Sequence, residues 1–300
     1  MAYHSRMRLA VFTKNTTNPA YAAARLGAER TAARLGAEVV HFVPRKADDV
    51  DEQIALIGEA QSGGFDAFVL VPVHATAVND AIARVLDAGI PVVNYLNRLS
   101  RGRFVSFVGA DDVALGRAIA RYLVDRLNGA GRLVVMEGMP GSVTSADRMR
   151  GFGEALAACP GIEVVATLQG EYQQVDGRAA MAGFLEAPHA PFDAVLAAID
   201  AMALGALEAL RERGLRPLVT GVNALPDAIA AIGRGELLAT VDFDAMKIAC
   251  IATEAAVRHL RGEPVPAEII LPAQVVDRSN CAAWDRPLEE RTCPRWEDVC

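Results

Sequence analysis

Short runs of apolar residues alternate with longer amphipathic segments along almost the whole chain. In the first third, the apolar runs predict strands at Leu9–Phe12, Glu38–Phe42, Ala67–Val71, Val92–Tyr95 and Phe104–Val108. Between them, apolar residues recur at helical spacing and predict helices at Tyr21–Leu35, Val50–Ser62 and Ala77–Ala88. This alternation predicts a parallel sheet with helices on both faces.

A second series of the same kind follows the first. It predicts helices at Val113–Leu127, Ser145–Ala158, Val175–Leu185 and Met202–Arg213, and strands at Leu133–Met136, Val164–Leu168, Ala194–Ala197, Leu218–Gly221 and Leu238–Asp242. A long helix at Ala245–Leu260, short apolar runs at Ile269–Leu271 and Gln274–Val276, and an irregular tail end the chain. We therefore expect an α/β protein of two similar lobes, each a doubly wound parallel sheet.

The lobe boundaries follow from the point where the second series begins. We predict an N-terminal lobe of residues 1–110 plus 244–272, and a C-terminal lobe of residues 111–243 plus 273–300 that includes the tail. Because no Gly/Ser-rich or Pro-rich linker separates the two series, we expect a hinge of several strands to join the lobes.

Composition narrows the possible functions. Hydrophobic residues make up 52% and charged residues 22% of the 300, which is typical of a compact globular protein. The formal net charge of −7 argues against a nucleic-acid partner or an anionic membrane surface, since both need an excess of Lys and Arg. No apolar run approaches the ~20 residues of a transmembrane helix.

The N-terminus lacks a secretion signature. Residues 1–8 lead directly into the first predicted strand and carry no signal-peptide pattern. This predicts either a cytosolic protein or one whose leader has been removed.

Cysteine usage leaves the redox compartment open. Cys159 and Cys250 fall in predicted helices, while Cys281, Cys293 and Cys300 fall in the tail. A disulfide within the tail would indicate an oxidising compartment, and three reduced thiols are the alternative. A zinc site is not expected, because the tail has neither a CxxC pair nor a histidine.

Motifs for catalysis and for cofactors are missing. No strand is followed by GxGxxG, and the chain contains neither GxxxxGK[ST] nor GxSxG. The five histidines are scattered without metal-ligand spacing: His4, His41, His74, His189 and His259. The Gly-rich loop Gly138–Ser142 is open to two interpretations, a ligand cradle or an ordinary turn. We therefore expect no cofactor, no metal and no enzymatic activity.

Several motifs, in order, resemble one known family. They are TTNPAY at Thr16–Tyr21, VPV at Val71–Val73, NR at Asn97–Arg98, GADDVALG at Gly109–Gly116, SADRMRGF at Ser145–Phe152, DAMALGAL at Asp200–Leu207 and GVN at Gly221–Asn223. From about Arg8 to Val276 the chain is similar to the type I periplasmic sugar-binding proteins of the ribose/galactose type. Lac-repressor-type regulators share this fold in their effector domains. Most of these motifs follow predicted strands, where open α/β sheets bind ligands, and the resemblance implies two lobes that close on a ligand by a hinge.

The resemblance implies a set of ligand contacts: Lys14, Asn18, Tyr21, Asn97, Arg98, Arg148, Tyr172, Asp200, Asn223 and Phe243. Asn97 and Asn223 stand where the family usually has Asp, Ala20 stands where an aromatic residue is usual, and Val71, Ile199 and Phe243 replace polar residues.

Each predicted contact also has a structural alternative. Asp200 is a good helix N-cap, and Arg98 or Lys14 would suit the surface. Arg148 would suit an ion pair on an exposed helix face, and Tyr172 and Phe243 would suit a core.

The charge of the ligand is open at this point. Lys14, Arg98 and Arg148 together favour an anion such as a sugar acid, because unpaired buried cations are costly. Alternatively, Asp200, Asp242 or Glu137 neutralises them, and the ligand is a neutral pentose, hexose or alditol, as is usual in the family.

The function implied by the resemblance is solute capture for an ABC importer. We expect a periplasmic, monomeric receptor that delivers a small polar ligand to a membrane permease. The alternatives are the sensing domain of a lac-repressor-type regulator and a chemosensory role.

Overall fold

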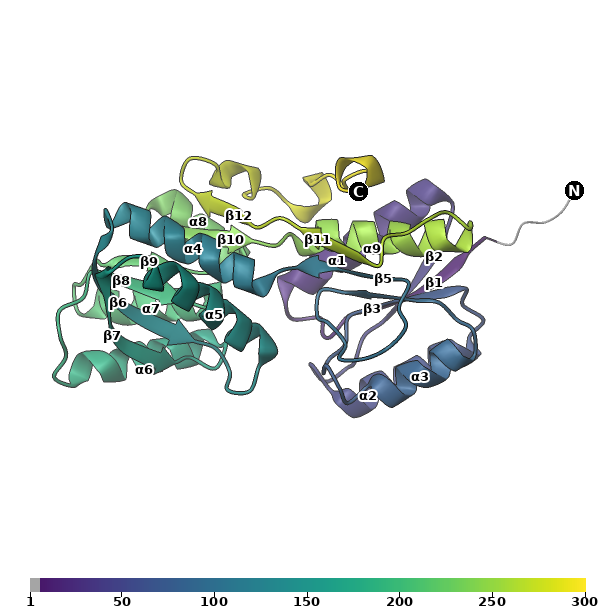
Figure 1. Ribbon diagram of the computed structural model, residues 1–300, viewed down its shortest axis with the longest axis horizontal. Coiled ribbons are helices and arrows are strands. Elements are labelled where there is room, and N and C mark those ends of the chain that lie inside the picture. The colour runs from purple at the N-terminus through teal and green to yellow at the C-terminus, as the bar shows by residue number, and fades with distance from the viewer. Residues whose placement is uncertain (1–5) are drawn as a thin grey trace, which may run out of the picture. The chain divides into compact units, whose positions relative to one another are not determined.

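Two compact units of α/β architecture make up the protein. The computed structural model describes residues 6–300, so residues 1–5 of the N-terminal segment considered above lie outside it. The first unit contains residues 6–110, Asp244–Leu271 and Pro287–Cys300, and the second contains Asp111–Phe243 and Pro272–Arg286. Each unit holds one six-stranded sheet dominated by parallel strands, which confirms the predicted fold class (Figure 1).

The sheet of the first unit is entirely parallel, in the order β11-β5-β4-β3-β1-β2. Its strands are β1 (Arg8–Phe12), β2 (Glu38–Phe42), β3 (Ala67–Leu70), β4 (Val92–Tyr95), β5 (Ser106–Ala110) and β11 (Glu268–Leu271). Its helices are α1 (Pro19–Leu35), α2 (Val50–Ser62), α3 (Asn79–Asp87) and α9 (Ala245–Leu260). α1 and α9 cover one face and α2 and α3 the other, so every residue of the central strands β3 and β4 is buried (Figure 1).

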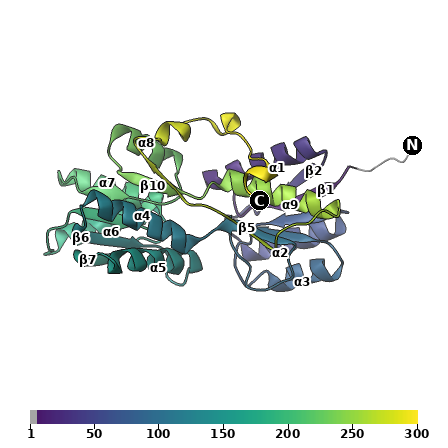
Figure 2. The ribbon, with the colours of Figure 1, turned by 45° about the horizontal axis from the view of Figure 1, so that its top comes forward.

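The sheet of the second unit has the order β12-β10-β9-β8-β6-β7. Five strands are parallel: β6 (Ala130–Glu137), β7 (Gly161–Gln169), β8 (Ala194–Ala197), β9 (Leu218–Thr220) and β10 (Ala239–Asp242). The last, β12 (Gln274–Asp277), is an antiparallel edge strand beside β10. Its helices are α4 (Asp112–Arg126), α5 (Val143–Ala157), α6 (Gln174–Glu186), α7 (Asp200–Glu212) and α8 (Pro226–Arg234), of which α8 was not predicted (Figure 2).

Glycine allows α4 and α5 to pack at very short range. A Cβ atom at Gly151 would lie 2.2 Å from the carbonyl oxygen of Val113 and 2.7 Å from the amide nitrogen of Arg117, both backbone atoms of α4. A Cβ at Gly153, on the same helix, would meet nothing within 4 Å. Any side chain at Gly151 must therefore push the two helices apart.

We expect Gly151→Ala to lower the free energy of unfolding by about 2 kcal/mol, because overpacking forces backbone shifts. Gly153→Ala is the matched control and is expected to raise it by up to about 1 kcal/mol, since Ala is the better helix former. Denaturant unfolding of both variants measures the difference. Equal effects of the two substitutions would show that the short approach of α4 and α5 is not a constraint.

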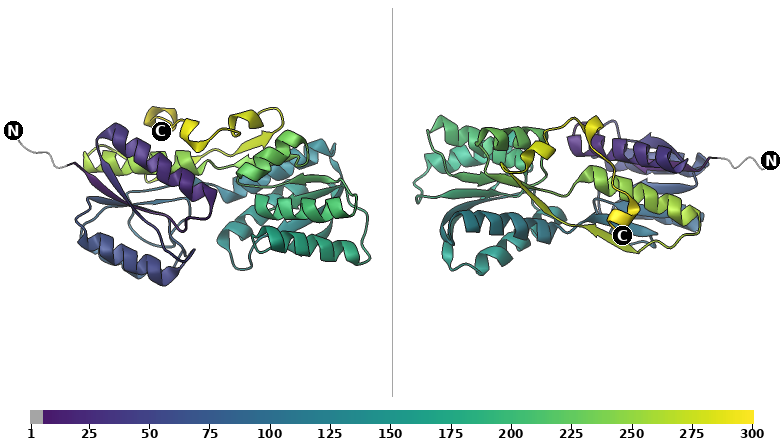
Figure 3. Two further views of the ribbon diagram at one scale, coloured as in Figure 1. Left: turned by 180° about the vertical axis from the view of Figure 1, so that it is seen from behind. Right: turned by 90° about the horizontal axis from the view of Figure 1, so that it is seen from above.

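The end of the tail belongs to the first unit, which corrects the predicted boundary. The prediction placed residues 273–300 with the C-terminal lobe, yet Pro287–Cys300 groups with the N-terminal one, and Pro272 already belongs to the second unit. Arg30 of α1 donates to the backbone carbonyls of Arg291 at 2.7 Å and Glu289 at 2.6 Å. In Figure 3 this yellow segment runs along α1 and α9.

Side-chain packing reinforces this placement of the tail. Leu288 and Cys293 pack against the small buried cluster of Ala23, Met246 and Cys250. The guanidinium of Arg258 lies 4.8 Å from the ring centre of the buried Trp296. The sequence pattern did not reveal this, because the segment contains only short 3₁₀ turns and no periodic apolar face.

Within residues 6–300, no helix combines the length and the apolar character that crossing a membrane requires.

Candidate functional site

The loop after β1 is organised by Asn15 and Asn18. The side chain of Asn15 accepts a hydrogen bond from the backbone N–H of Asn18 at 2.9 Å, and the Asn18 side chain accepts one from Ala20 N–H at 2.9 Å, which caps α1. Asn18 is therefore a cap whatever its role towards a ligand. Burial raises the pKa of Tyr21, in the first turn of α1, well above its usual value.

Lys14 lies in the same loop and is largely buried. Its Nζ lies 3.9 Å from Oδ1 of Asp48, and its side chain is only 20% exposed. Burial lowers the pKa of Lys14, and the carboxylate of Asp48 partly opposes this effect. The structure thus rules out the alternative in which Lys14 points freely into solvent.

Asn94, which the sequence analysis did not select, shapes the loop after β4. Its buried Nδ2 donates to the carbonyls of Leu70 at 3.1 Å and Asn97 at 2.9 Å, and its Oδ1 accepts from Leu99 N–H at 2.9 Å. These bonds fix the backbone of Asn97. The side-chain amide of Asn97 makes no hydrogen bond to any part of the chain that the structure describes, so it is available to a ligand.

Arg98, the next residue, is engaged within the first unit. Its guanidinium forms an ion pair with Glu268 of β11 and lies 3.8 Å from the ring centre of Phe107. Its side chain is 55% exposed. This is the surface role that the sequence left open as an alternative, and Arg98 would have to leave both partners to bind a ligand.

Arg148 of α5 is buried and points at the end of β8. Its Nε donates to Oδ1 of Asp112 at 2.9 Å, and its Nη1 donates to the carbonyl of Ala198 at 2.8 Å. The second terminal nitrogen, Nη2, has no hydrogen-bond partner among residues 6–300. Arg148 is therefore no exposed i,i+4 partner, and it has N–H donors left for a ligand.

Asp200 connects three neighbouring segments at the same edge. Its fully buried carboxylate accepts from the Thr240 hydroxyl at 2.7 Å and from Leu225 N–H at 2.8 Å. Its own backbone N–H donates to Val222 at 2.9 Å. The proposed N-cap role is wrong, because α7 has no side-chain cap and Asp200 is its first residue. Burial raises the pKa of Asp200 to about 6.

Asn223 has the strongest signature of a ligand contact. Its backbone φ is 113°, a conformation rare for a residue with a side chain. Its Oδ1 is buried and has no hydrogen-bond partner within residues 6–300. A buried acceptor without a partner costs about 1–3 kcal/mol, so a ligand hydroxyl that donates to it would recover that free energy.

Of the three predicted aromatic contacts, Tyr21 is buried, whereas Tyr172 and Phe243 are half-buried and are not core residues. The Tyr172 hydroxyl lies 3.2 Å from Oγ of Ser142, the N-cap of α5, and Tyr172 has a φ of 64°. Phe243 ends the first of the two segments that make up the second unit, Asp111–Phe243. Partial exposure leaves part of each ring surface free to pack against a sugar ring.

Hydrogen bonds to backbone carbonyls bring together Arg148, Asp200 and Asn223. Arg148 binds Ala198 at the end of β8, Asp200 follows Ala198 by two residues, and the Asp200–Val222 bond joins this turn to the one that carries Asn223. Trp284, another residue that the sequence analysis missed, donates from Nε1 to the carboxylate of Asp242 at 2.7 Å. The carboxyl edge of this sheet is therefore lined by polar groups with fixed geometry.

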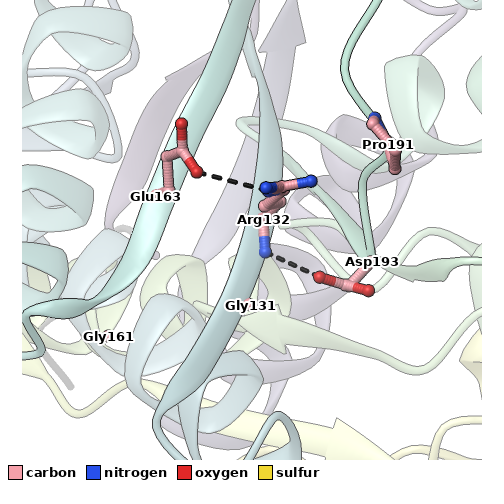
Figure 4. Close-up of a pocket in the computed structure, with 6 residues that line it drawn as sticks. All are labelled: Gly131, Arg132, Gly161, Glu163, Pro191 and Asp193. Carbon is pink, nitrogen blue, oxygen red and sulfur yellow. Dashed lines mark hydrogen bonds and ion pairs between the residues drawn. The ribbon is translucent and has the colours of Figure 1, made fainter.

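A depression of about 300 Å³ lies at the opposite, amino end of the second unit's strands (Figure 4). Its lining includes Arg132, Glu163 and Asp193. Arg132 Nε donates to Glu163 at 3.3 Å, and the Arg132 backbone N–H donates to Asp193 at 2.7 Å. Because these charged groups satisfy one another, this depression is a weaker candidate than the carboxyl edge.

The described residues contain no group of three or more His, Cys, Asp or Glu side chains that could hold a metal ion.

Comparison with known proteins reveals one family. The family model described as periplasmic binding protein domain matches residues 9–264. The ribose import binding protein RbsB of Bacillus subtilis is 31% identical over 267 residues, which cover 89% of this chain and 85% of the relative. The resemblance inferred from the sequence motifs is thereby confirmed.

Two solved structures are similar over nearly their full length. An ABC transporter periplasmic solute-binding protein of Actinobacillus succinogenes with bound D-allose has a TM-score of 0.86 and 25% identity, covering 92% of this chain and 99% of its own. The Caulobacter myo-inositol binding protein, bound to myo-inositol, has a TM-score of 0.81 and 28% identity, with coverages of 93% and 96%. All three of these relatives are binding proteins.

Proposed function

Because this chain belongs to the periplasmic binding protein family, we propose that it is the solute-binding receptor of an ABC importer for a small, neutral sugar or cyclic polyol. The relatives named above bind ribose, D-allose and myo-inositol. The polar groups at the carboxyl edges of the two sheets suit the hydroxyls of such a ligand.

One observation supports a neutral ligand: each cation of the predicted site has a carboxylate partner in its own unit. Lys14 lies near Asp48, Arg98 pairs with Glu268, and Arg148 binds Asp112 at 2.9 Å. The sequence left open whether Asp200, Asp242 or Glu137 neutralises these cations. The carboxylates that lie beside them are instead those of Asp48, Glu268 and Asp112. No excess positive charge remains to favour a sugar acid.

We assign the ligand contacts to groups with unused hydrogen-bonding capacity. In the first unit this is the Asn97 amide, with Lys14 and Tyr21 beside the same edge. In the second unit these are Nη2 of Arg148 and the amide of Asn223, with Tyr172 and Phe243 as candidate packing surfaces. Asp200 and Asn18 hold loops in place, and closure of the two lobes on the ligand stays a prediction.

The cellular setting follows from the same proposal. A receptor of an ABC importer delivers its ligand to a membrane permease, and we place this chain in the periplasm as a monomer. The relatives are transport proteins, which leaves the regulator and chemosensory alternatives without a supporting observation.

A thermal-shift screen tests both the class and the charge of the ligand. Ribose, D-allose, myo-inositol and xylitol are compared with gluconate and glucuronate. At a hundredfold excess over Kd, a ligand of the folded state adds about 2.7 kcal/mol, which we expect to raise Tm by about 5 °C for a neutral compound.

The Asn223→Ala variant is the control for this screen. Its Tm without ligand is expected to stay close to that of the parent, because loss of the unpaired buried acceptor stabilises the fold while alanine fits a φ of 113° less well than asparagine does. Its ligand-induced shift is expected to disappear. A shift with the sugar acids alone would contradict the neutral-ligand proposal, and no shift with any compound would contradict the receptor proposal.

A further inference from the structure

Two cysteines that lie far apart in the sequence are neighbours where the tail packs against α9. Cys250 is in the middle of α9 and fully buried, and Cys293 is in the tail and half-buried. The Sγ atoms of both point at the carbonyl oxygen of Gly27 on α1, at 3.5 Å from Cys250 and 4.0 Å from Cys293. Cys293 also packs against the buried cluster that contains Cys250, so the two thiols are neighbours beside one carbonyl group.

The surroundings of the pair are apolar and close-packed. Cys250 belongs to a buried cluster with Ala23 and Met246, against which Leu26, Leu288 and Cys293 pack. Arg30 holds the tail on either side of Leu288 and Cys293 through the carbonyls of Glu289 and Arg291. The tail is thus fixed in a register that keeps Cys293 on Cys250.

We propose that Cys250 and Cys293 form a disulfide that fastens the C-terminal tail to α9 of the first unit. Both thiols are free in the structure, so the bond requires an oxidant, for which a disulfide such as oxidised glutathione suffices. The thiolate of Cys293 attacks the oxidant and releases one thiolate. Cys250, after losing its proton to solvent, attacks the Cys293 sulfur and releases the second. Two protein thiols are oxidised, and one external disulfide is reduced to two thiols.

The environment favours Cys293 as the attacking residue. The neighbouring Cys250 thiol lowers the pKa of Cys293, and the charges of Arg30 and Arg34 act in the same direction. The proximity of Cys293, together with burial, raises the pKa of Cys250. Cys293 is also the more accessible of the two, which suits a first reaction with an external disulfide.

The proposed bond differs from the tail disulfide considered from the sequence alone. That hypothesis involved only Cys281, Cys293 and Cys300, whereas the structure places Cys281 in the second unit and Cys293 in the first. The Cys250–Cys293 bond would close a long loop that contains β11 and β12. Closing a long loop restricts the unfolded chain strongly, so the bond is expected to stabilise the fold.

Peptide mapping of the full chain tests the proposal directly. Trypsin places each of the five cysteines in a different peptide, and the expected linked pair is residues 248–258 with residues 292–295. The protein is incubated with reduced and oxidised glutathione, alkylated and digested without reductant. Recovery of this linked pair supports the proposal. Unlinked peptides, or Cys293 linked to Cys281 or Cys300, would overturn it.

A stability measurement adds a second readout with matched variants. The oxidised protein is expected to melt at least about 4 °C above the reduced protein. Cys281→Ser and Cys300→Ser should keep this difference, while Cys293→Ser should abolish it. If the Cys293→Ser variant keeps the oxidation-dependent shift, another pair of cysteines carries it and the assignment is wrong.

Discussion

Replacing Arg148 with lysine is expected to weaken binding of the neutral ligand at least about 100-fold. The guanidinium uses Nε for Asp112 and Nη1 for Ala198, and Nη2 is the donor that we propose for the ligand. A lysine ammonium is a single point donor and cannot maintain all three directions. Loss of a buried, charged hydrogen bond costs about 2–5 kcal/mol, and 2.7 kcal/mol corresponds to a factor of 100 in Kd.

The matched control for this variant is Arg150→Lys on the same helix. Arg150 is exposed and, within residues 6–300, pairs only with Asp147, three residues before it, so its replacement should leave Kd unchanged. Isothermal titration with the compound found by thermal shift measures both variants, and circular dichroism confirms that each is folded. An unchanged Kd for Arg148→Lys would show that Arg148 has only a structural role in joining α4, α5 and the end of β8.

Most of the fold was predictable because parallel α/β units carry a strong local signal. Central strands are buried on both faces and appear as unbroken apolar runs, as in β3 and β8. The exception, α8, also had a signal: Pro226 at its start, Gly235 after its end and buried Ile229 and Ile232 on one face. It is only nine residues long, so the helical spacing of its apolar residues repeats too few times to stand out in the sequence.

The site was less predictable, because partner choice depends on tertiary structure. The sequence suggested that Asp200 caps α7, yet the carboxylate reaches Thr240 and Leu225, which are 40 and 25 residues away. Arg98, a predicted ligand contact, pairs with Glu268, which is 170 residues further along the chain. No local pattern reveals such pairs, whereas loops and caps such as that of Asn18 depend on neighbouring residues and could be anticipated.

The tail also makes contacts that a local sequence pattern cannot predict. Its contacts with Arg30 span about 260 residues of sequence, and the Trp284–Asp242 bond spans 42. Neither contact repeats along the chain, so no periodicity predicts them.

The buried carboxyl of Asp200 is expected to make the stability of the protein depend on pH. Burial raises its pKa from 3.8 to about 6, so the folded state binds a proton more tightly than the unfolded state does. The stabilisation by this proton is complete below pH 4 and is lost as the pH rises through 6. The contribution of Asp200 to the free energy of unfolding should therefore fall by about 2 kcal/mol between pH 4 and pH 7.

The Asp200→Asn variant isolates this contribution, because asparagine has nearly the same shape and no titratable proton. Unfolding by urea is measured for both proteins from pH 4 to pH 7, and the free energy of the parent is subtracted from that of the variant at each pH. This difference is expected to rise with pH by about 2 kcal/mol. The hydrogen bonds that Asn fails to make with Thr240 or Leu225 shift the whole curve but leave its slope unaffected. A difference that stays constant from pH 4 to pH 7 would mean that Asp200 is ionised throughout, in which case Arg148 and the two donors compensate fully for burial of the charge.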